Sequence, residues 1–510
     1  MESEIILILD FGSQFTHLIK TELAKRSIQS KIRPGDIDLE RFKKNNPQTV
    51  IQGVILTGGS RSVHKEEINF DKKWTESNFP VLGICYGVNF LKGFDFDWTN
   101  LKYEEEKINF KKETQFSKNI SENIEVLMAR EVGSLLIPEK YSVTADSSSG
   151  WAIAENKKDK HYAVRFHPEV ADTEKGGQIL ENFCLEICGI KKGKGWTPER
   201  FFKETKRKYL NVVGDEKIIF GLSGGVDSMT MAALLRKMFP PEQLRAVYID
   251  SGLMPDKTMG EVEEFCRQYD IPLTIKDSAD VFFKNLKGVQ DPSEKGKAIG
   301  RVFIREFEGV AKKYDAEYFA QGTIWSDVIE SGVTKFSSEI KPHHNVGGLP
   351  EKMNFNLIEP FRELFKNQVR EIANYLKLPK KIVNKKVFPG PGFAIRVDGE
   401  VTRQKVSFVR KCTEIVEDVI FNSDINDDIW MAFAILANVS SLGIKDGERV
   451  ENDQAIVIRI VESDDSMTVK FSRKAYPCLE EISQRIVNET SIKRVVYDIT
   501  DKPPATIEWQ

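Results

Sequence analysis

Short apolar runs that lead to a glycine recur along the first 190 residues. The runs Ile5–Asp10, Val54–Thr57 and Val81–Ile84 are almost wholly apolar, and each gives way to a helical pattern. Strands of a parallel sheet have this composition, because helices cover both faces of the sheet. Residues 1–190 are therefore predicted to form a doubly wound α/β domain, with the polar, lysine-rich residues 99–125 as a surface excursion.

A second strand–loop–helix–strand pattern begins after a lysine- and glycine-rich segment at 191–195. Its parts are the strand Lys217–Leu222, the loop Ser223–Ser228, a helix through Leu235 and the strand Ala246–Asp250. Past residue 395 the strands alternate, as in Ala455–Val461 and Arg494–Ile499, with helices at Gln404–Val419 and Leu479–Asn488. We expect a second doubly wound parallel-sheet domain over 191–395 and a smaller α+β domain over 396–510.

Composition and charge exclude several classes of protein. The chain has 510 residues, and its 74 Lys and Arg nearly balance 77 Asp and Glu. This balance argues against binding through bulk charge, so we expect neither nucleic acid nor membrane as a partner. No apolar run approaches the roughly 18 residues that span a bilayer, and Met1–Glu4 is acidic where a signal peptide is basic. Six cysteines without a CxxC pair suit a reducing compartment, and we expect a cytoplasmic protein.

The first candidate catalytic residue is Cys85, which stands between Gly83 and Gly87 where a predicted strand meets a helix. Such an elbow strains the backbone of a nucleophile, needs glycine neighbours and directs the sulfur toward a helix N-terminus, which favours the thiolate. Taken alone, the cysteine fits a buried residue near a turn equally well. His167 and Glu169 change this balance, because residues two apart at a strand end face the same way and the carboxylate can orient the imidazole as a general base. These three residues are predicted to form a catalytic triad.

The triad motifs, together with Asp10–Gln14 and Thr57–Gly59, resemble the class I glutamine amidotransferases. By that resemblance, Cys85 attacks the side-chain amide of glutamine and releases ammonia. The resemblance also implies an oxyanion hole formed by the backbone N–H groups of Gly59 and Tyr86.

A second candidate site lies between a predicted strand and a predicted helix, in a loop that contains two glycines and two serines. Glycine lets backbone N–H groups converge on an anion, the serine hydroxyls add donors, and the aspartate of the loop can bind Mg²⁺. The loop resembles the PP-loop of ATP pyrophosphatases, which adenylate an oxygen, expel pyrophosphate and then replace AMP with a nucleophile. The ATP-binding residues implied are Ser223, Gly224, Gly225, Val226, Asp227 and Ser228, with Asp227 as the metal ligand.

Further segments resemble the glutamine-hydrolysing GMP synthases, and this resemblance covers all three predicted domains. The segments are Ala320–Thr323, Asp327–Ser331, Ile340–Pro350, Phe388–Gly392 and Val495–Trp509. The resemblance implies that the chain uses XMP, ATP, glutamine and Mg²⁺ to make GMP through an adenylyl-XMP intermediate, and that the third domain forms a homodimer. It also implies a cationic lid and an XMP site, at Lys341, His343 and His344 and at Lys502, Ile507 and Glu508, respectively.

Two alternatives remain open. One is another PP-loop amidotransferase ligase, which makes NAD or modifies tRNA; the histidine pair of the lid and the C-terminal tail argue against it. The other is a catalytically weakened regulatory relative, because the chain departs from the family pattern at Asn89, Ala129, Gly296, Lys386 and Met431. Pyrophosphate release on addition of XMP and ATP distinguishes these possibilities.

Overall fold

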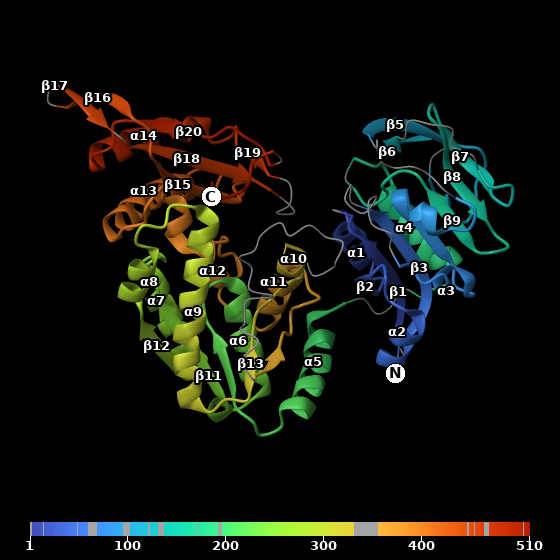
Figure 1. Cartoon of the computed structure of the whole chain (residues 1–510), viewed down its shortest axis with the longest axis horizontal. Helices are drawn as coiled ribbons and strands as arrows, with labels where there is room; N and C mark the ends of the chain where they lie inside the picture. Colours follow the sequence, from blue (N-terminus) through green and yellow to red (C-terminus); the bar gives the residue numbers. More distant parts are fainter. Residues whose placement is uncertain are drawn as a thin grey trace. The chain divides into compact units, whose positions relative to one another are not determined.

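The described part of the chain forms two compact units, one up to Phe201 and one from Phe202 onward (Figure 1). The computed structural model describes residues 3–13, 15–47, 49–59, 69–94, 102–120, 123–130, 137–170, 172–191, 196–330, 355–445, 448–452, 454–463, 469–502 and 504–509. None of the helices in these ranges is long and apolar enough to cross a membrane.

The first unit is built on a nine-stranded mixed sheet. In spatial order its strands are β2 (Ser30–Pro34), β1 (Ser3–Phe11), β3 (Thr49–Gly59), β4 (Val81–Ile84), β9 (His161–Val164), β8 (Gly150–Asn156), β7 (Ser142–Ser147), β5 (Lys102–Phe110) and β6 (Asn123–Arg130). The pairs from β2 to β9 are parallel, and those from β9 to β6 are antiparallel. Every residue of β4 is buried, as expected for the middle of a parallel sheet.

Short helices follow the parallel strands of this unit along the chain. They are α1 (Thr16–Lys25), α2 (Leu39–Asn45), α3 (Lys73–Glu76), η2 (Cys85–Phe90), α4 (Gly176–Asn182) and η3 (Phe183–Ile187). The start of α2 is set by Asp38, whose carboxylate accepts a hydrogen bond from the backbone N–H of Arg41 at 2.7 Å.

The surface excursion expected at residues 99–125 is wrong, because β5 and β6 belong to the main sheet. Their sequence is polar because one face of this antiparallel part meets solvent. In β5 the inward positions are Glu106 and Ile108. The buried carboxylate of Glu106 accepts hydrogen bonds from the hydroxyls of Ser148 at 3.3 Å and Ser149 at 2.9 Å.

The second unit contains a five-stranded sheet in which all strands are parallel. Its order is β12 (Leu273–Asp277), β11 (Leu244–Asp250), β10 (Ile218–Gly221), β13 (Tyr318–Ala320) and β14 (Asn356–Ile358). The helices of this part are α5 (Pro198–Val213), α6 (Val226–Met238), η4 (Pro241–Gln243), α7 (Lys257–Gln268), α8 (Ala279–Leu286), α9 (Pro292–Tyr314), α10 (Trp325–Glu330), α11 (Lys366–Tyr375), α12 (Lys380–Val383) and η5 (Gly392–Arg396).

A smaller α+β part completes the second unit. Its sheet consists of β15 (Met431–Ala437), β18 (Ala455–Glu462), β19 (Lys470–Phe471) and β20 (Val495–Tyr497). A separate hairpin is formed by β16 (Ser441–Lys445) and β17 (Glu448–Asn452). The helices are α13 (Arg403–Phe421) and α14 (Tyr476–Glu489). The expected fold class, two parallel-sheet α/β parts and a C-terminal helix-plus-sheet part, is confirmed.

One cluster of buried apolar side chains joins the five-stranded sheet to the C-terminal part. It runs from Ile219 and Val247 on the sheet through Phe393 and Val397 to Val409 on α13. Residues 392–397 are therefore buried between the two parts rather than free in solvent, and close packing fixes their positions.

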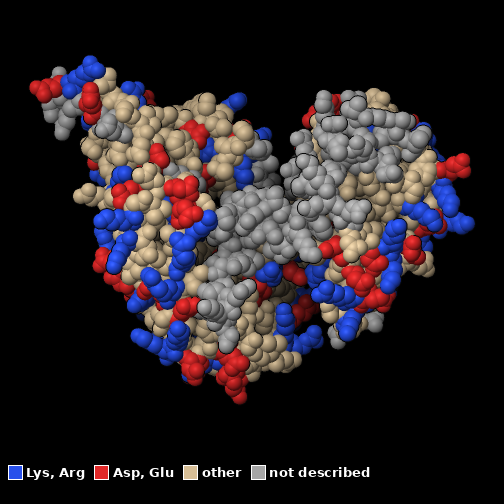
Figure 2. Space-filling model, in the orientation of Figure 1, with Lys and Arg blue, Asp and Glu red and all other residues tan. Residues whose placement is uncertain are grey.

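The charged side chains follow the near-neutral balance of the sequence. On the face shown in Figure 2, Lys and Arg side chains are interspersed with Asp and Glu side chains over both units. Neither sign dominates the described surface of this face, so its long-range field is weak.

Candidate functional site

Cys85 lies at the junction of β4 and η2, as the sequence predicts. Its φ is +51°, a strained value for a residue with a side chain, and the residue is 1% exposed. A Cβ on Gly87 would lie 2.2 Å from the carbonyl oxygen of Leu56, and one on Gly83 would lie 2.9 Å from that of Gly87. Only glycine fits at these two positions, so packing against the sheet maintains the elbow.

His167 and Glu169 form a buried pair beside this elbow. Nδ1 of His167 is 2.7 Å from Oε1 of Glu169, and each side chain is 1% exposed. Burial lowers the pKa of His167, but the charges of Glu169 and Cys85 outweigh burial and raise this pKa to about 10. Nε2, on the far side of the ring, is buried, and the hydrogen bond between the imidazole and Cys85 also raises the pKa of His167. The ring is therefore oriented by Glu169 and is poised as an imidazolium next to the thiol.

The two residues expected to form the oxyanion hole also lie together. Gly59 ends β3, and its backbone packs against the ring of Tyr86, since a Cβ there would lie 2.7 Å from Cδ1 of that ring. The neighbouring Gly58 packs against Cε1 of His167. The end of β3 thus borders both the elbow and the imidazole.

Two aromatic rings that sequence reasoning missed contact the imidazole. The ring centroid of His167 is 5.0 Å from that of Phe15 and 5.4 Å from that of Tyr103, both in edge-to-face geometry. Phe15 precedes α1, and Tyr103 belongs to β5. These residues are distant in sequence from one another and from the triad, so no local motif indicates them.

The glycine- and serine-rich loop joins β10 to α6, as predicted. The hydroxyls of Ser223 and Ser228 are 3.1 Å apart, and the N–H of Gly225 donates to Oγ of Ser223 at 3.3 Å. Gly224 has a φ of +79°, and a Cβ there would lie 2.8 Å from Cγ2 of Thr258. The loop therefore curls around its own serine hydroxyls at the N-terminus of α6, where an anion is attracted by the helix dipole.

Lys366 is a third residue that the sequence did not indicate. Its ammonium group, at the start of α11, forms an ion pair with Oδ2 of Asp227. Oδ1 of Asp227 is buried and has no hydrogen-bond partner among the described residues. Gly322, in the segment after β13, packs against the backbone of Asp227, and the hydroxyl of the adjacent Thr323 is likewise buried without a partner in the described part.

Asp227 by itself offers Mg²⁺ too few ligands, so the ion would be bound together with a substrate. Its free carboxylate oxygen is a suitable hard ligand. The described residues contain no group of three or more His, Cys, Asp or Glu side chains that could hold a metal ion. Phosphate oxygens would therefore have to supply most of the coordination, as Mg²⁺ sites on nucleotides do.

The expected lid residues Lys341, His343 and His344 lie outside the described residues. Their placement stays a prediction from the resemblance.

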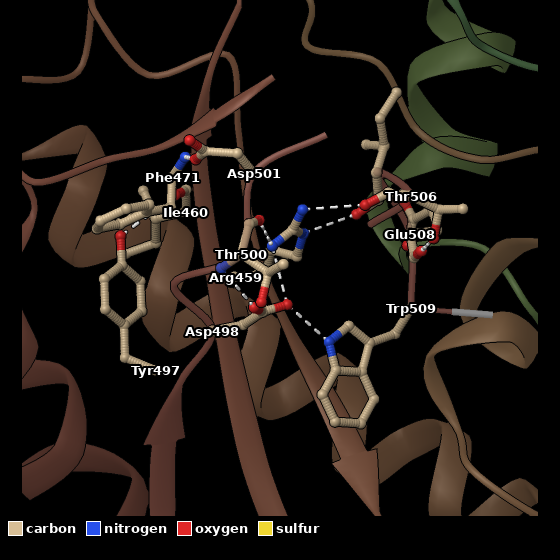
Figure 3. A network of polar contacts seen from close by, with 11 residues as sticks. Arg459, Ile460, Phe471, Tyr497, Asp498, Thr500, Asp501, Thr506, Glu508 and Trp509 are labelled. Carbon is tan, nitrogen blue, oxygen red and sulfur yellow. Dashed lines mark hydrogen bonds and ion pairs between the residues drawn. The ribbon is translucent and has the colours of Figure 1, made fainter. Parts of the chain in front are cut away.

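The expected XMP residues lie on a C-terminal tail that is held by two buried arginines, Arg459 and Arg396. Arg459, on β18, is 0% exposed and donates hydrogen bonds to the carbonyl oxygens of Thr500, Thr506 and Ile507, each at 2.9 Å, and to Asp498 at 2.8 Å. Figure 3 shows this guanidinium surrounded by the tail. The tail is thus ordered by the protein itself.

Arg396 holds the end of the same tail. Its guanidinium donates two hydrogen bonds to the carboxylate of Glu508, at 2.8 and 3.1 Å. Lys502 pairs with Val469 at the edge of the sheet, and Ile507 is buried in an apolar cluster with Met431. The three expected residues thus lie on one segment. Met431, where the chain departs from the family pattern, belongs to the same apolar cluster as Ile507 of that segment.

The comparisons with known proteins divide the chain into three regions. Residues 7–187 match the family model for glutamine amidotransferase class-I, residues 198–382 match the PP-loop domain, and residues 418–509 match the GMP synthase C terminal domain. The domain limits expected at 190 and 395 stay predictions.

Two full-length relatives carry the same name. The chain is 40% identical to "GMP synthase [glutamine-hydrolyzing]" of Aquifex aeolicus, covering 100% of both chains, and 41% identical to the protein of that name in Staphylococcus aureus, covering 100% of this chain and 99% of the relative. Among solved structures, NMN synthetase from Francisella tularensis is 19% identical, with a TM-score of 0.31, over 41% of this chain and 84% of that chain.

Proposed function

The chain belongs to the glutamine-hydrolysing GMP synthase family, and we propose that it divides the family's reaction between a glutaminase site at Cys85 and a nucleotide site at Ser223–Ser228. It is a ligase that converts XMP, ATP and glutamine to GMP, AMP, pyrophosphate and glutamate. The strongest support for the division is that one chain holds both a buried cysteine–histidine–glutamate arrangement and a separate phosphate-binding loop.

At the glutaminase site, the sulfur of Cys85 attacks the carbonyl carbon of the glutamine side chain. His167 gives its proton to the leaving nitrogen, so that ammonia departs and an acyl-cysteine remains. Water then attacks this thioester with His167 as the general base, and glutamate is released. Glu169 holds the ring with Nε2 toward the sulfur throughout.

The backbone N–H groups of Gly59 and Tyr86 stabilise the oxyanion of each tetrahedral intermediate. Their assignment is supported by the contact between these two residues next to the elbow. The rings of Phe15 and Tyr103 limit the rotation of the imidazole.

At the nucleotide site, O2 of XMP attacks the α-phosphorus of ATP, and pyrophosphate leaves. The hydroxyls of Ser223 and Ser228 and the backbone N–H groups of the loop bind the pyrophosphate portion. Ammonia then attacks the activated carbon of adenylyl-XMP, and AMP leaves. We assign the lid Lys341, His343 and His344 to charge neutralisation at the phosphates, on the resemblance alone.

Asp227 is proposed to hold Mg²⁺ through its unpartnered Oδ1, together with phosphate oxygens of ATP. When bound, the ion neutralises charge on the phosphates during transfer. Lys366 remains on the other carboxylate oxygen and supplies a second positive charge near the leaving pyrophosphate.

The tail residues Lys502, Ile507 and Glu508 are proposed to bind XMP. A lysine at a sheet edge offers a compact cation for the phosphate. The ordering of the tail by Arg459 and Arg396 supports this assignment, because a preorganised site loses less conformational entropy on binding.

Two further features are proposed. Apolar side chains near the C-terminal sheet are exposed: Leu442 by 47%, Ile444 by 74% and Ile499 by 60%. Such a surface supports a homodimer through this part, which the mass of the purified protein in solution would test.

All six cysteines are free thiols, which supports a reducing, cytoplasmic location.

The function is tested by incubating the purified chain with ATP, Mg²⁺ and ammonium, with either XMP or nicotinic acid adenine dinucleotide. Pyrophosphate and GMP are expected only with XMP. Pyrophosphate release with the dinucleotide and none with XMP would assign the chain to another PP-loop ligase.

A further inference from the structure

Arg396 is a buried arginine of the second unit that contacts three aromatic rings and the C-terminal tail. It ends η5 and is 2% exposed. Its guanidinium carbon lies 4.1 Å from the ring centroid of Phe433, 4.8 Å from that of Phe388 and 5.8 Å from that of Phe393. Three rings within cation–π range hold the planar group in one orientation.

One edge of this guanidinium binds a single carboxylate through two parallel hydrogen bonds. Nη2 donates to Oε1 of Glu508 at 2.8 Å, and Nε donates to Oε2 at 3.1 Å. The carboxylate is 13% exposed, and each of its oxygens keeps a further acceptor direction. Glu508 is therefore held in a fixed orientation and can still accept a hydrogen bond from a ligand.

The segment that carries Arg396 is tied to the end of strand β11. The N–H of Phe393 donates to the carbonyl oxygen of Leu253 at 2.8 Å, and a Cβ on Gly392, whose φ is +65°, would lie 2.3 Å from the same oxygen. On the other side, Nζ of Lys295, a residue that is 0% exposed, donates to the carbonyl oxygen of Val397 at 2.6 Å. Ligands of open α/β sheets bind at the carboxyl ends of the strands, which is where Leu253 lies.

A buried ion pair is often no more stabilising than apolar residues of the same volume, and its best-attested use is to specify one conformation. Arginine is needed here rather than lysine, because only the guanidinium is bidentate and stacks on aromatic rings.

We propose that Arg396 is a positioning residue for XMP, which acts by fixing the carboxylate of Glu508, and with it the C-terminal tail, against the segment that follows β11. This inference rests on the proposed function, because it takes over the assignment of the tail to XMP. The residue does not touch the reacting atoms.

The test measures the KM for XMP and the KM for ATP, with ammonium as nitrogen source, in Arg396→Lys, Glu508→Gln, the double variant of these two, and Lys502→Ala. Arg396→Lys keeps the charge and loses the fork, and it should raise the KM for XMP roughly 10- to 100-fold while the KM for ATP changes about 2-fold or less. The double variant should be no worse than Glu508→Gln alone, because both changes break one interaction. The control is Arg485→Lys on α14, whose side chain pairs with Asp418 and Glu489 and should leave both constants unchanged.

Four outcomes overturn the inference. An unchanged KM for XMP in Arg396→Lys, when Glu508→Gln and Lys502→Ala raise it, removes the positioning role and leaves the tail assignment intact. Unchanged constants in Arg396→Lys, Glu508→Gln and Lys502→Ala show that the tail itself does not bind XMP. Additive effects in the double variant, or equal increases for XMP and ATP, show that Arg396 only supports the fold. If Arg396→Lys does not fold, the Glu508→Gln variant alone must reproduce the selective loss of XMP affinity.

Discussion

Nδ1 of His167 lies 2.7 Å from Oε1 of Glu169, and both side chains are almost completely buried. In this setting the carboxylate is the main source of the raised imidazole pKa, because the charge of Glu169 acts across a short distance without screening by water. The pair therefore sets both the orientation and the protonation state of the base.

Replacing Glu169 with glutamine should lower glutamine hydrolysis roughly 100-fold, at the low end of what general acid–base catalysis contributes. The variant keeps the shape of the site and loses the charge. Initial rates of glutamate formation measure the effect. The matched control is Glu174→Gln, an exposed carboxylate that accepts a hydrogen bond from the backbone N–H of Glu125 at 3.1 Å, and it should hydrolyse glutamine at the normal rate. Equal rates in Glu169→Gln and in this control would exclude the triad.

The same substitution should change the pH dependence of glutamine hydrolysis. Because the leaving nitrogen takes its proton from the His167 imidazolium, activity is expected to persist until the pH approaches the pKa of about 10. Removing the negative charge of Glu169 lowers this pKa, so the alkaline limb of the rate profile should move to lower pH in Glu169→Gln. Rates measured from pH 6 to 11 give the two profiles. A limb that stays in place would show that another group controls it.

Replacing Asp227 with asparagine should remove XMP-dependent pyrophosphate release and leave glutamine hydrolysis intact. The amide cannot hold Mg²⁺ with a full negative charge, and it leaves Lys366 without its partner. Pyrophosphate is measured over a range of Mg²⁺ concentrations, and the variant should need more of the ion for any residual activity. Asp280→Asn is the control, because that carboxylate is 98% exposed and pairs with Arg403, away from the loop. Normal pyrophosphate release by Asp227→Asn would disprove the metal assignment.

Replacing Lys502 with alanine should raise the KM for XMP roughly 10- to 100-fold, the equivalent of about 1.5 to 3 kcal/mol for a charge-assisted hydrogen bond. The KM for ATP should change little. The apolar Met431 beneath the tail offers no polar contact to XMP, which makes the chain more dependent on Lys502. Lys474→Ala, which removes a lysine that pairs with Asp428, serves as control. An unchanged KM for XMP in Lys502→Ala would place the phosphate elsewhere.

The parts of the sites that lie within one short segment were predictable from the sequence. The elbow at Cys85, the His167–Glu169 pair and the loop Ser223–Ser228 each depend on residues that are neighbours in the chain, so their residue types and spacing carry the signal. Strand β5 was not predicted, because one of its inward positions is the acidic Glu106, which hides the alternation of apolar and polar residues.

The partners of these motifs were not predictable, because they come from distant segments. Lys366 reaches Asp227 across 139 positions, and Arg396 reaches Glu508 across 112. A lysine or arginine in isolation is most often a solvated surface residue. Only the fold shows that Arg396 and Arg459 are buried and what they hold.

The most direct test of the central claim, that one chain contains separate sites for making and using ammonia, is GMP formation by Cys85→Ala with two nitrogen sources. With glutamine the variant should form no GMP, because no other residue replaces the thiolate nucleophile. With ammonium at saturating concentration it should form GMP at the wild-type rate, since the loop at Ser223–Ser228 is untouched. Loss of activity with both nitrogen sources, in a variant that remains folded, would contradict the account.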